Sequence, residues 1–187
     1  PSGRVRRVRS GTVMFSDEQR EQMLDIAVSA IRQSDVAVDL PRYLQERGCS
    51  FVTLRREGEL LGCIGALEPY QELGRDIAAH AYAAANEDPR FPPVRDLRGV
   101  HVEVSVLGPL TEFPAVSYED VVTRLPRSGA VVSAAGHRGT FLPAVWDQLP
   151  TSELFVAGLW RKAGLRPGYW PAQVWTYDVE EFGRTVS

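Results

Sequence analysis

The spacing of apolar residues along the chain predicts an irregular alternation of short helices and strands. Four valines at alternate positions between residues 100 and 107, separated by polar residues, predict a strand with one buried face. Apolar residues three and four positions apart predict amphipathic helices over about 17–32 and 71–87. By the same criteria we expect further strands at 50–56, 59–64, 130–134 and 172–179, and shorter helices at 116–125, 143–148 and 151–162.

Capping and turn residues mark the boundaries of these elements. A capping box begins the first helix at Ser16, and Glu57-Gly58 is typical of the tight turn of a hairpin. Three prolines make 88–93 a rigid loop, and residues 136–139 look like a second turn. Neither a regular βαβ series nor an internal repeat is present. We therefore predict an α+β fold with a mainly antiparallel sheet flanked by helices.

Charge changes the picture in one respect. The chain has 187 residues and a formal net charge of −3, with 20 arginines and the single lysine Lys162. The scattered arginines point mainly to a GC-rich coding genome, and Lys162 has no glycine-rich loop before it, which excludes a phosphate-binding loop.

Residues 1–9 hold four arginines and no acid, so we expect 1–14 to be a disordered basic arm or an expression remnant before one domain over 15–187. The rest carries −7, which argues against nucleic-acid binding.

The number of cysteines and the hydropathy of the chain indicate the cellular compartment in which the protein works. Cys49 and Cys63 are too few for a disulfide scaffold, and no cysteine and histidine residues have the spacing of zinc ligands. No apolar run approaches the roughly 18 residues of a membrane span. We expect a protein of the reducing cytoplasm of a bacterium, with no metal and no organic cofactor.

The sequence Gly62-Cys63-Ile64-Gly65 is the first candidate for chemistry. Glycines on both sides allow a ligand or another backbone segment to approach Cys63. Cys63 is therefore either a reactive thiol that lines a pocket or a small buried residue in a tightly packed strand. The residues by themselves favour the second interpretation, because free cysteines are commonly buried and inert.

The polar face of the predicted strand at 100–107 is the second candidate. His101, Glu103 and Ser105 place an imidazole, a carboxyl group and a hydroxyl in a row, which is enough for acid–base catalysis. The plainer interpretation is the solvent-facing side of a half-exposed sheet. If that face is covered, the Glu103 carboxyl must find a partner or stay protonated. His80, on the alanine-rich helix, is more typical of a half-buried structural residue.

Two arginines stand beside groups that suit a ligand. Arg138 and Thr140, where a strand begins, offer a guanidinium and a hydroxyl to an anion, or Arg138 is simply a solvated turn residue. Arg90, in the proline-rich loop, either holds a carboxylate ligand or pairs with Asp88 or Glu87. No catalytic triad spacing, zinc-protease motif or nucleotide fingerprint is present.

Six short motifs follow one another at 51–54, 61–65, 88–93, 103–107, 138–146 and 162–165. They read Phe-Val-Thr-Leu, Leu-Gly-Cys-Ile-Gly, Asp-Pro-Arg-Phe-Pro-Pro, Glu-Val-Ser-Val-Leu, Arg-Gly-Thr-Phe-Leu-Pro-Ala-Val-Trp and Lys-Ala-Gly-Leu. In this order they resemble the AmmeMemoRadiSam system protein A family, whose domain is shared with the human protein named after the AMME chromosomal region. The resemblance covers about residues 16–182. Linked motifs in a fixed order are far more specific than any one of them.

The resemblance implies a fold and possible partners. It implies an α+β fold with a larger antiparallel-sheet subdomain, a smaller lobe and a groove between them. Members are often encoded beside, or fused to, a Memo-like protein and a radical SAM protein, so both are expected partners. The family's hairpin motif usually reads Leu-Arg-Gly-Cys-Ile-Gly, and Leu61 stands here in the place of the arginine. We therefore expect the thiol of Cys63 to lack a positive neighbour.

With this resemblance, the candidates combine into one functional hypothesis. We expect an enzyme that acts on a small polar or anionic metabolite in a groove lined by Cys63, Glu103, Arg138 and Thr140. Cys63 is the expected nucleophile or pocket thiol, Glu103 the general acid or base, and Thr140 a further catalytic group. The expected substrate-binding residues are Arg138, Arg90, His137, Ser105 and His101. The alternatives are a non-catalytic adaptor for a partner enzyme and, with less support, an RNA- or nucleotide-binding protein.

Overall fold

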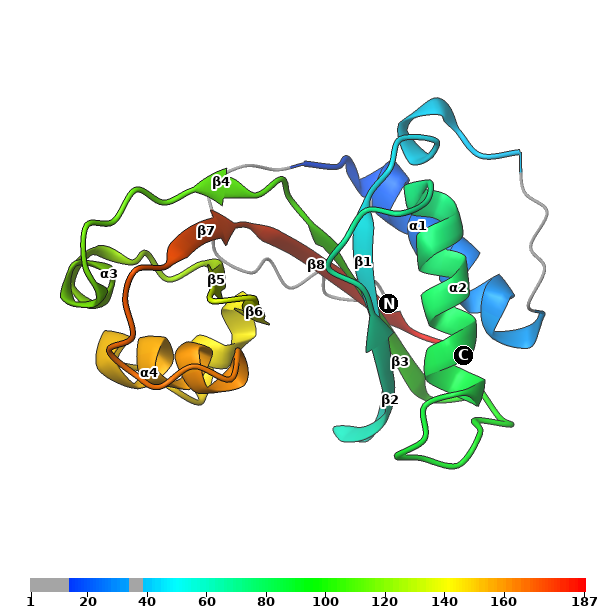
Figure 1. The fold of residues 1–187 in the computed structure, drawn as a ribbon. Helices are drawn as coiled ribbons and strands as arrows, with labels where there is room; N and C mark the ends of the chain where they lie inside the picture. The colour runs from blue at the N-terminus through cyan, green and yellow to red at the C-terminus, as the bar shows by residue number, and fades with distance from the viewer. Residues whose placement is uncertain (1–13, 34–38) are drawn as a thin grey trace. The chain divides into compact units, whose positions relative to one another are not determined.

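The computed structural model describes residues 14–33 and 39–187, which form two compact units (Figure 1). Unit 1 consists of the chain up to Leu107 together with Glu180–Ser187, and unit 2 is Gly108–Val179. The expected basic arm, except for its last residue, lies outside the described residues, as do residues 34–38 after the first helix. The helices and antiparallel strand pairs of the two units confirm the α+β class.

Unit 1 is built on a four-stranded sheet with the strand order β2-β1-β3-β8. Its strands are β1 (Cys49–Arg56), β2 (Glu59–Gly65), β3 (Val100–Leu107) and β8 (Val179–Thr185). The central strand β1 pairs antiparallel with β2 and with β3. Glu57 and Gly58 have φ angles of 50° and 87°, so the predicted tight turn between β1 and β2 is confirmed.

Two helices, α1 (Asp17–Arg32) and α2 (Leu73–Asn86), cover one face of this sheet (Figure 1). The predicted capping box of α1 is present, because the Ser16 hydroxyl accepts from the Gln19 N–H and the Gln19 side chain accepts from the Ser16 N–H. All four valines of β3 are buried in the core below the helices. The predicted two-faced character of this strand is therefore confirmed.

Close packing of α2 against β2 depends on Gly62. A Cβ atom at this position would lie 1.9 Å from the carbonyl oxygen of Ala84, far inside any allowed contact. Gly62 faces the helix, so Cys63, the next residue of the strand, points to the other face of the sheet. Gly62 thus allows the backbone of α2 to approach β2 on the face opposite the Cys63 thiol.

Unit 2 contains the second sheet, with the strand order β4-β7-β5-β6, and two helices on its core. Its elements are β4 (Thr111–Glu112), α3 (Tyr118–Arg124), β5 (Gly129–Ala134), β6 (His137–Phe141), α4 (Ser152–Lys162) and β7 (Gln173–Tyr177). Short 3₁₀ helices are η1 (Arg42–Leu44) in unit 1 and η2 (Pro143–Asp147) in unit 2. The Trp146 and Phe155 rings stack with centroids 3.9 Å apart. All four tryptophans belong to unit 2.

Three features differ from the prediction: the second turn, the last predicted strand and the unpredicted strand β4. The second turn lies at Ala135-Gly136, with φ angles of 50° and 77°, so His137–Phe141 is a strand rather than a turn. The single strand expected at 172–179 is two strands, because β7 ends at Tyr177 and β8 joins the sheet of unit 1. Consecutive glutamates hide the apolar alternation of β8. The two-residue β4 is too short to produce a pattern.

Candidate functional site

The face of the unit 1 sheet opposite α1 and α2 gathers four of the eight residues that the sequence predicts for chemistry, namely Cys63, His101, Glu103 and Ser105. Thr53 pairs with Cys63 on one side and with Glu103 on the other. Directly paired residues of antiparallel strands point to the same face, and the neighbours Val52 and Leu54 belong to the core below the helices. Cys63, Thr53 and Glu103 therefore form a row across three strands, which we call the thiol row.

Contacts and spacing within the thiol row indicate how its members can act. The Thr53 hydroxyl donates a hydrogen bond to the Cys63 Sγ over 3.3 Å. Thr53 is buried, whereas Cys63 and Glu103 are half-buried. Adjacent strands are separated by about 4.8 Å, so about 10 Å separates the Cα atoms of Cys63 and Glu103. The thiol and the carboxyl group are thus suited to different parts of a small molecule rather than to each other.

His101 and Ser105 share this face with Glu103, as the alternation in β3 predicts. The His101 Nδ1 lies 3.2 Å from the Thr185 hydroxyl, and its ring occupies the space above Gly183 in β8. Ser105 is buried beside Phe51, its partner in β1. The interpretation of this side of β3 as a solvent-facing surface is therefore wrong at Ser105.

The loop after α2 holds the outer edge of β2 at Cys63. The Cys63 N–H donates to the Asp88 Oδ2 over 3.0 Å, and the Arg90 Nη2 donates to the Cys63 carbonyl oxygen over 3.1 Å. Arg90 also donates from Nε and Nη2 to the two Asp88 oxygens, at 3.0 and 2.8 Å. These guanidinium hydrogen bonds, against the effect of burial, hold the pKa of Asp88 well below its ordinary value. Asp88 and Arg90 thus form a closed clamp around one backbone residue.

The clamp corrects the expectation that the thiol lacks a positive neighbour. Leu61 is the extra residue of a β-bulge in β2 and packs against the apolar core of unit 1. The guanidinium beside Cys63 comes from Arg90 instead. The pKa of Arg90 is raised, chiefly by its hydrogen bond to Asp88, against burial, and further by the charges of Asp88 and Cys63. Of the alternatives that the sequence left open for Arg90, the pairing with Asp88 is present.

The other predicted residues, His137, Arg138 and Thr140, lie on β6 of unit 2. The Thr140 hydroxyl lies 3.0 Å from the Ala130 carbonyl oxygen and 2.9 Å from the Tyr177 hydroxyl, so it links three strands. The Arg138 guanidinium lies 5.9 Å from the centre of the Trp175 ring, a cation–π distance. His137 is exposed beside Gly164, after α4. The hydrogen bonds of Thr140 therefore give this residue a structural role in the sheet of unit 2.

Sequence reasoning missed a buried polar cluster between β1 and α2, formed by Ser50, Asp76 and His80. Asp76 is fully buried and accepts from the N–H and hydroxyl of Ser50, at 2.8 and 2.6 Å. The His80 Nδ1 lies 3.2 Å from the same carboxylate oxygen, and Gln71 donates to the other oxygen. The Ser50 hydroxyl donates to the Asp76 carboxylate, and the His80 Nδ1 lies 3.3 Å from the Ser50 Oγ, so the serine-to-histidine-to-aspartate order of a catalytic relay is not reproduced. The four-residue spacing of Asp76 and His80 on a helix is the signal that was available.

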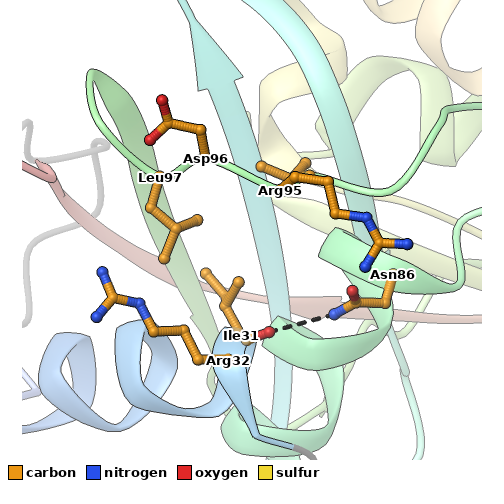
Figure 2. A pocket seen from close by; sticks show the side chains of 7 residues that line it. Ile31, Arg32, Asn86, Arg95, Asp96 and Leu97 are labelled. Carbon is orange, nitrogen blue, oxygen red and sulfur yellow. Dashed lines mark hydrogen bonds between the residues drawn. The ribbon is translucent and has the colours of Figure 1, made fainter.

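A separate cavity of about 380 Å³ lies in unit 1 at the ends of both helices (Figure 2). It is lined by Ile31, Arg32, Asn86, Val94, Arg95, Asp96 and Leu97. Figure 2 shows the guanidinium groups of Arg32 and Arg95 directed to different sides, and the Asn86 amide donates to the Ile31 carbonyl. Because these groups do not converge, and no predicted site residue is among them, we place the candidate site at the thiol row.

Residues 14–33 and 39–187 lack two features of other classes of protein. No group of three or more His, Cys, Asp and Glu side chains in this range is arranged to hold a metal ion. No helix in the same range is long and apolar enough to cross a membrane.

Comparisons with known proteins agree with the motifs. The AMMECR1 family matches residues 21–182. The chain belongs to the AMMECR1 family. A relative from Methanothermobacter thermautotrophicus is 39% identical over 138 residues, which are 69% of this chain and 70% of the relative. A relative from Methanocaldococcus jannaschii is 37% identical over 154 residues, 74% of this chain and 73% of the relative.

A solved structure shows the same fold. The crystal structure of an uncharacterized protein from Pyrococcus horikoshii matches this AMMECR1 chain with a TM-score of 0.77 and 30% sequence identity. The match covers 91% of this chain and 93% of the other. All three of these relatives come from archaea, and they give no support to the expectation of a bacterial host.

Proposed function

We propose that this AMMECR1 protein is an enzyme that acts on a small polar or anionic metabolite at the thiol row of unit 1. Cys63 is the nucleophile, and Glu103 is the general acid and base. The observation that supports this assignment most directly is the register of β2, β1 and β3. It aligns a half-buried thiol, a hydroxyl that donates to its sulfur and a half-buried carboxyl group on one face.

The proposed chemistry is the transfer of a group through the sulfur. The Cys63 thiol gives its proton to water, and the thiolate sulfur forms a bond with an electrophilic carbon of the substrate. The leaving group departs with the bonding pair and takes a proton from the Glu103 carboxyl. A second acceptor, activated by the Glu103 carboxylate, then displaces the sulfur and regenerates the thiolate. This sequence requires no organic cofactor.

The test compares the full chain with two site variants on a metabolite extract of its native host, analysed by untargeted mass spectrometry. We expect the wild-type protein to deplete one or a few metabolites. We expect Cys63→Ser and Glu103→Gln each to slow this depletion by about 100-fold or more. Glu59→Gln, which changes an exposed carboxylate at the start of β2, is the matched control and retains full activity.

Two outcomes would contradict the proposal. If Cys63→Ser and Glu103→Gln deplete the same metabolites at the wild-type rate, the assigned residues are wrong. If the wild-type protein depletes nothing but binds a partner enzyme from the host stoichiometrically, such as a Memo-like or radical SAM protein, the adaptor role replaces the enzymatic one.

A further inference from the structure

The Arg90 guanidinium is held in one place beside Cys63. Its Nε and Nη2 are bound by the Asp88 carboxylate, and Nη2 also donates to the Cys63 carbonyl oxygen. The guanidinium carbon lies 5.2 Å from the centre of the Phe91 ring, a cation–π contact that supports one face of the group. A cation with this many contacts loses little further freedom when it binds a ligand.

The clamp also sets where this cation lies relative to the thiol. Asp88 binds the N–H of Cys63 while Arg90 binds its carbonyl oxygen, so both ends of one residue are held. The guanidinium is therefore tied to the residue that carries the sulfur. A ligand group bound to the arginine is therefore held beside the residue that carries the nucleophile.

The Asp88–Arg90 pair presents its positive end to solvent. The Asp88 side chain is 2% exposed, and the Arg90 side chain is 57% exposed. In residues 14–33 and 39–187 the Nη1 nitrogen of Arg90 makes no hydrogen bond, so both of its N–H groups are open to a ligand. The open donors of a guanidinium suit carboxylate and phosphate oxygens.

We infer that Arg90 makes the thiol row selective for electrophiles that carry an oxyanion close to the reacting carbon. The Nη1 N–H groups bind the oxyanion while the Cys63 sulfur attacks, and Asp88 is the positioning residue that holds the arginine. This inference rests on the proposed role of Cys63 as a nucleophile, and it names the substrate class of that site.

Two alkylating probes of nearly equal size test the inference. Iodoacetate carries a carboxylate and iodoacetamide a neutral amide, and each transfers its carbon to the thiolate with loss of iodide. The rates at Cys63 are measured on the full chain by peptide mass mapping at low ionic strength. Both reagents require the thiolate, so the ratio of their rates does not depend on how much thiolate is present.

We expect Arg90→Gln to lower the iodoacetate-to-iodoacetamide rate ratio at Cys63 by about five-fold or more. Raising the salt concentration on the wild-type protein should lower the ratio in the same direction. Arg98→Gln is a matched control and leaves the ratio unchanged. Arg98 makes the same Asp-x-Arg contacts with Asp96 but none with Cys63. If Arg90→Gln does not fold, Arg90→Lys is the second variant. It keeps the positive charge but loses the planar set of guanidinium donors, so its iodoacetate-to-iodoacetamide rate ratio should lie between that of the wild type and that expected for Arg90→Gln.

The failures of the two proposals are distinguishable. If Cys63 of the wild-type protein reacts with neither reagent at neutral pH, the nucleophile assignment fails and the inference fails with it. If Cys63 reacts but the ratio is the same in Arg90→Gln, in Arg98→Gln and at high salt, the nucleophile assignment stands and the inference about Arg90 is overturned.

Discussion

Two cysteines in one small protein show how surroundings separate a candidate nucleophile from an inert thiol. Cys63 is half-buried, with a hydroxyl donor at its sulfur and a guanidinium bound to its carbonyl oxygen. Cys49 is 7% exposed, and its pKa is raised to about 11, first by burial and then by the charges of Asp76 and Glu68. The residue type alone therefore decides nothing about reactivity.

The raised pKa of Cys49 leads to a prediction about pH. The folded state favours the neutral thiol of Cys49. The contribution of this neutral thiol to the stability of the fold is complete below the ordinary pKa of 9.0 and is lost as pH rises towards about 11. We expect iodoacetamide to label Cys63 at pH 8 and leave Cys49 unlabelled. The Cys49 rate should then rise up to about pH 11, in samples whose circular dichroism is unchanged. Peptide mapping gives both rates, and equal labelling at pH 8 would contradict the assignment.

At the scale of elements, the Ser50–Asp76–His80 cluster joins β1 to α2. Replacing Asp76 by alanine removes the buried carboxylate that the Ser50 N–H, the Ser50 hydroxyl and His80 all contact. We expect Asp76→Ala to lower the free energy of unfolding by about 3 kcal/mol. Urea unfolding followed by circular dichroism measures this loss.

The control for Asp76→Ala is a second carboxylate at the same end of the helix. Glu72 pairs with Arg75 at the surface, and exposed pairs contribute at most about 1 kcal/mol. Glu72→Gln should therefore change the unfolding free energy little. Equal losses in the two variants would show that the buried cluster does not link β1 to α2.

The same elements show what local sequence can and cannot predict. The capping box at Ser16 and the valine alternation of β3 act within a few residues, and both are visible without a fold. That Glu103 lies on the polar face follows from the same alternation. That Thr53 stands between Glu103 and Cys63 depends on the register of three strands, which distant parts of the chain determine. The contact of Arg90 with the Cys63 backbone likewise joins residues far apart in sequence.

At the scale of the whole molecule, the chain leaves unit 1 at Leu107 and returns to it at Glu180. The returning strand β8 brings Phe182 into the apolar core of unit 1 and Glu180 to Arg20 on α1, at 2.7 Å. Unit 1 is thus completed only by the last residues of the chain. Each apolar core draws its residues from one unit, which gives the protein two separate centres of stability.

A pair of matched substitutions tests this division. Phe182 in unit 1 and Phe155 in unit 2 are both fully buried aromatic residues, and truncation to alanine should cost about 3–5 kcal/mol at either place. Since all four tryptophans lie in unit 2, their fluorescence reports the unfolding of that unit. We expect Phe182→Ala to weaken hydrogen-exchange protection in β1 and β3 while the fluorescence transition keeps its midpoint. Phe155→Ala should shift the fluorescence midpoint and leave the protection of β1 and β3 intact, and equal shifts of both probes in both variants would show one cooperative unit instead of two.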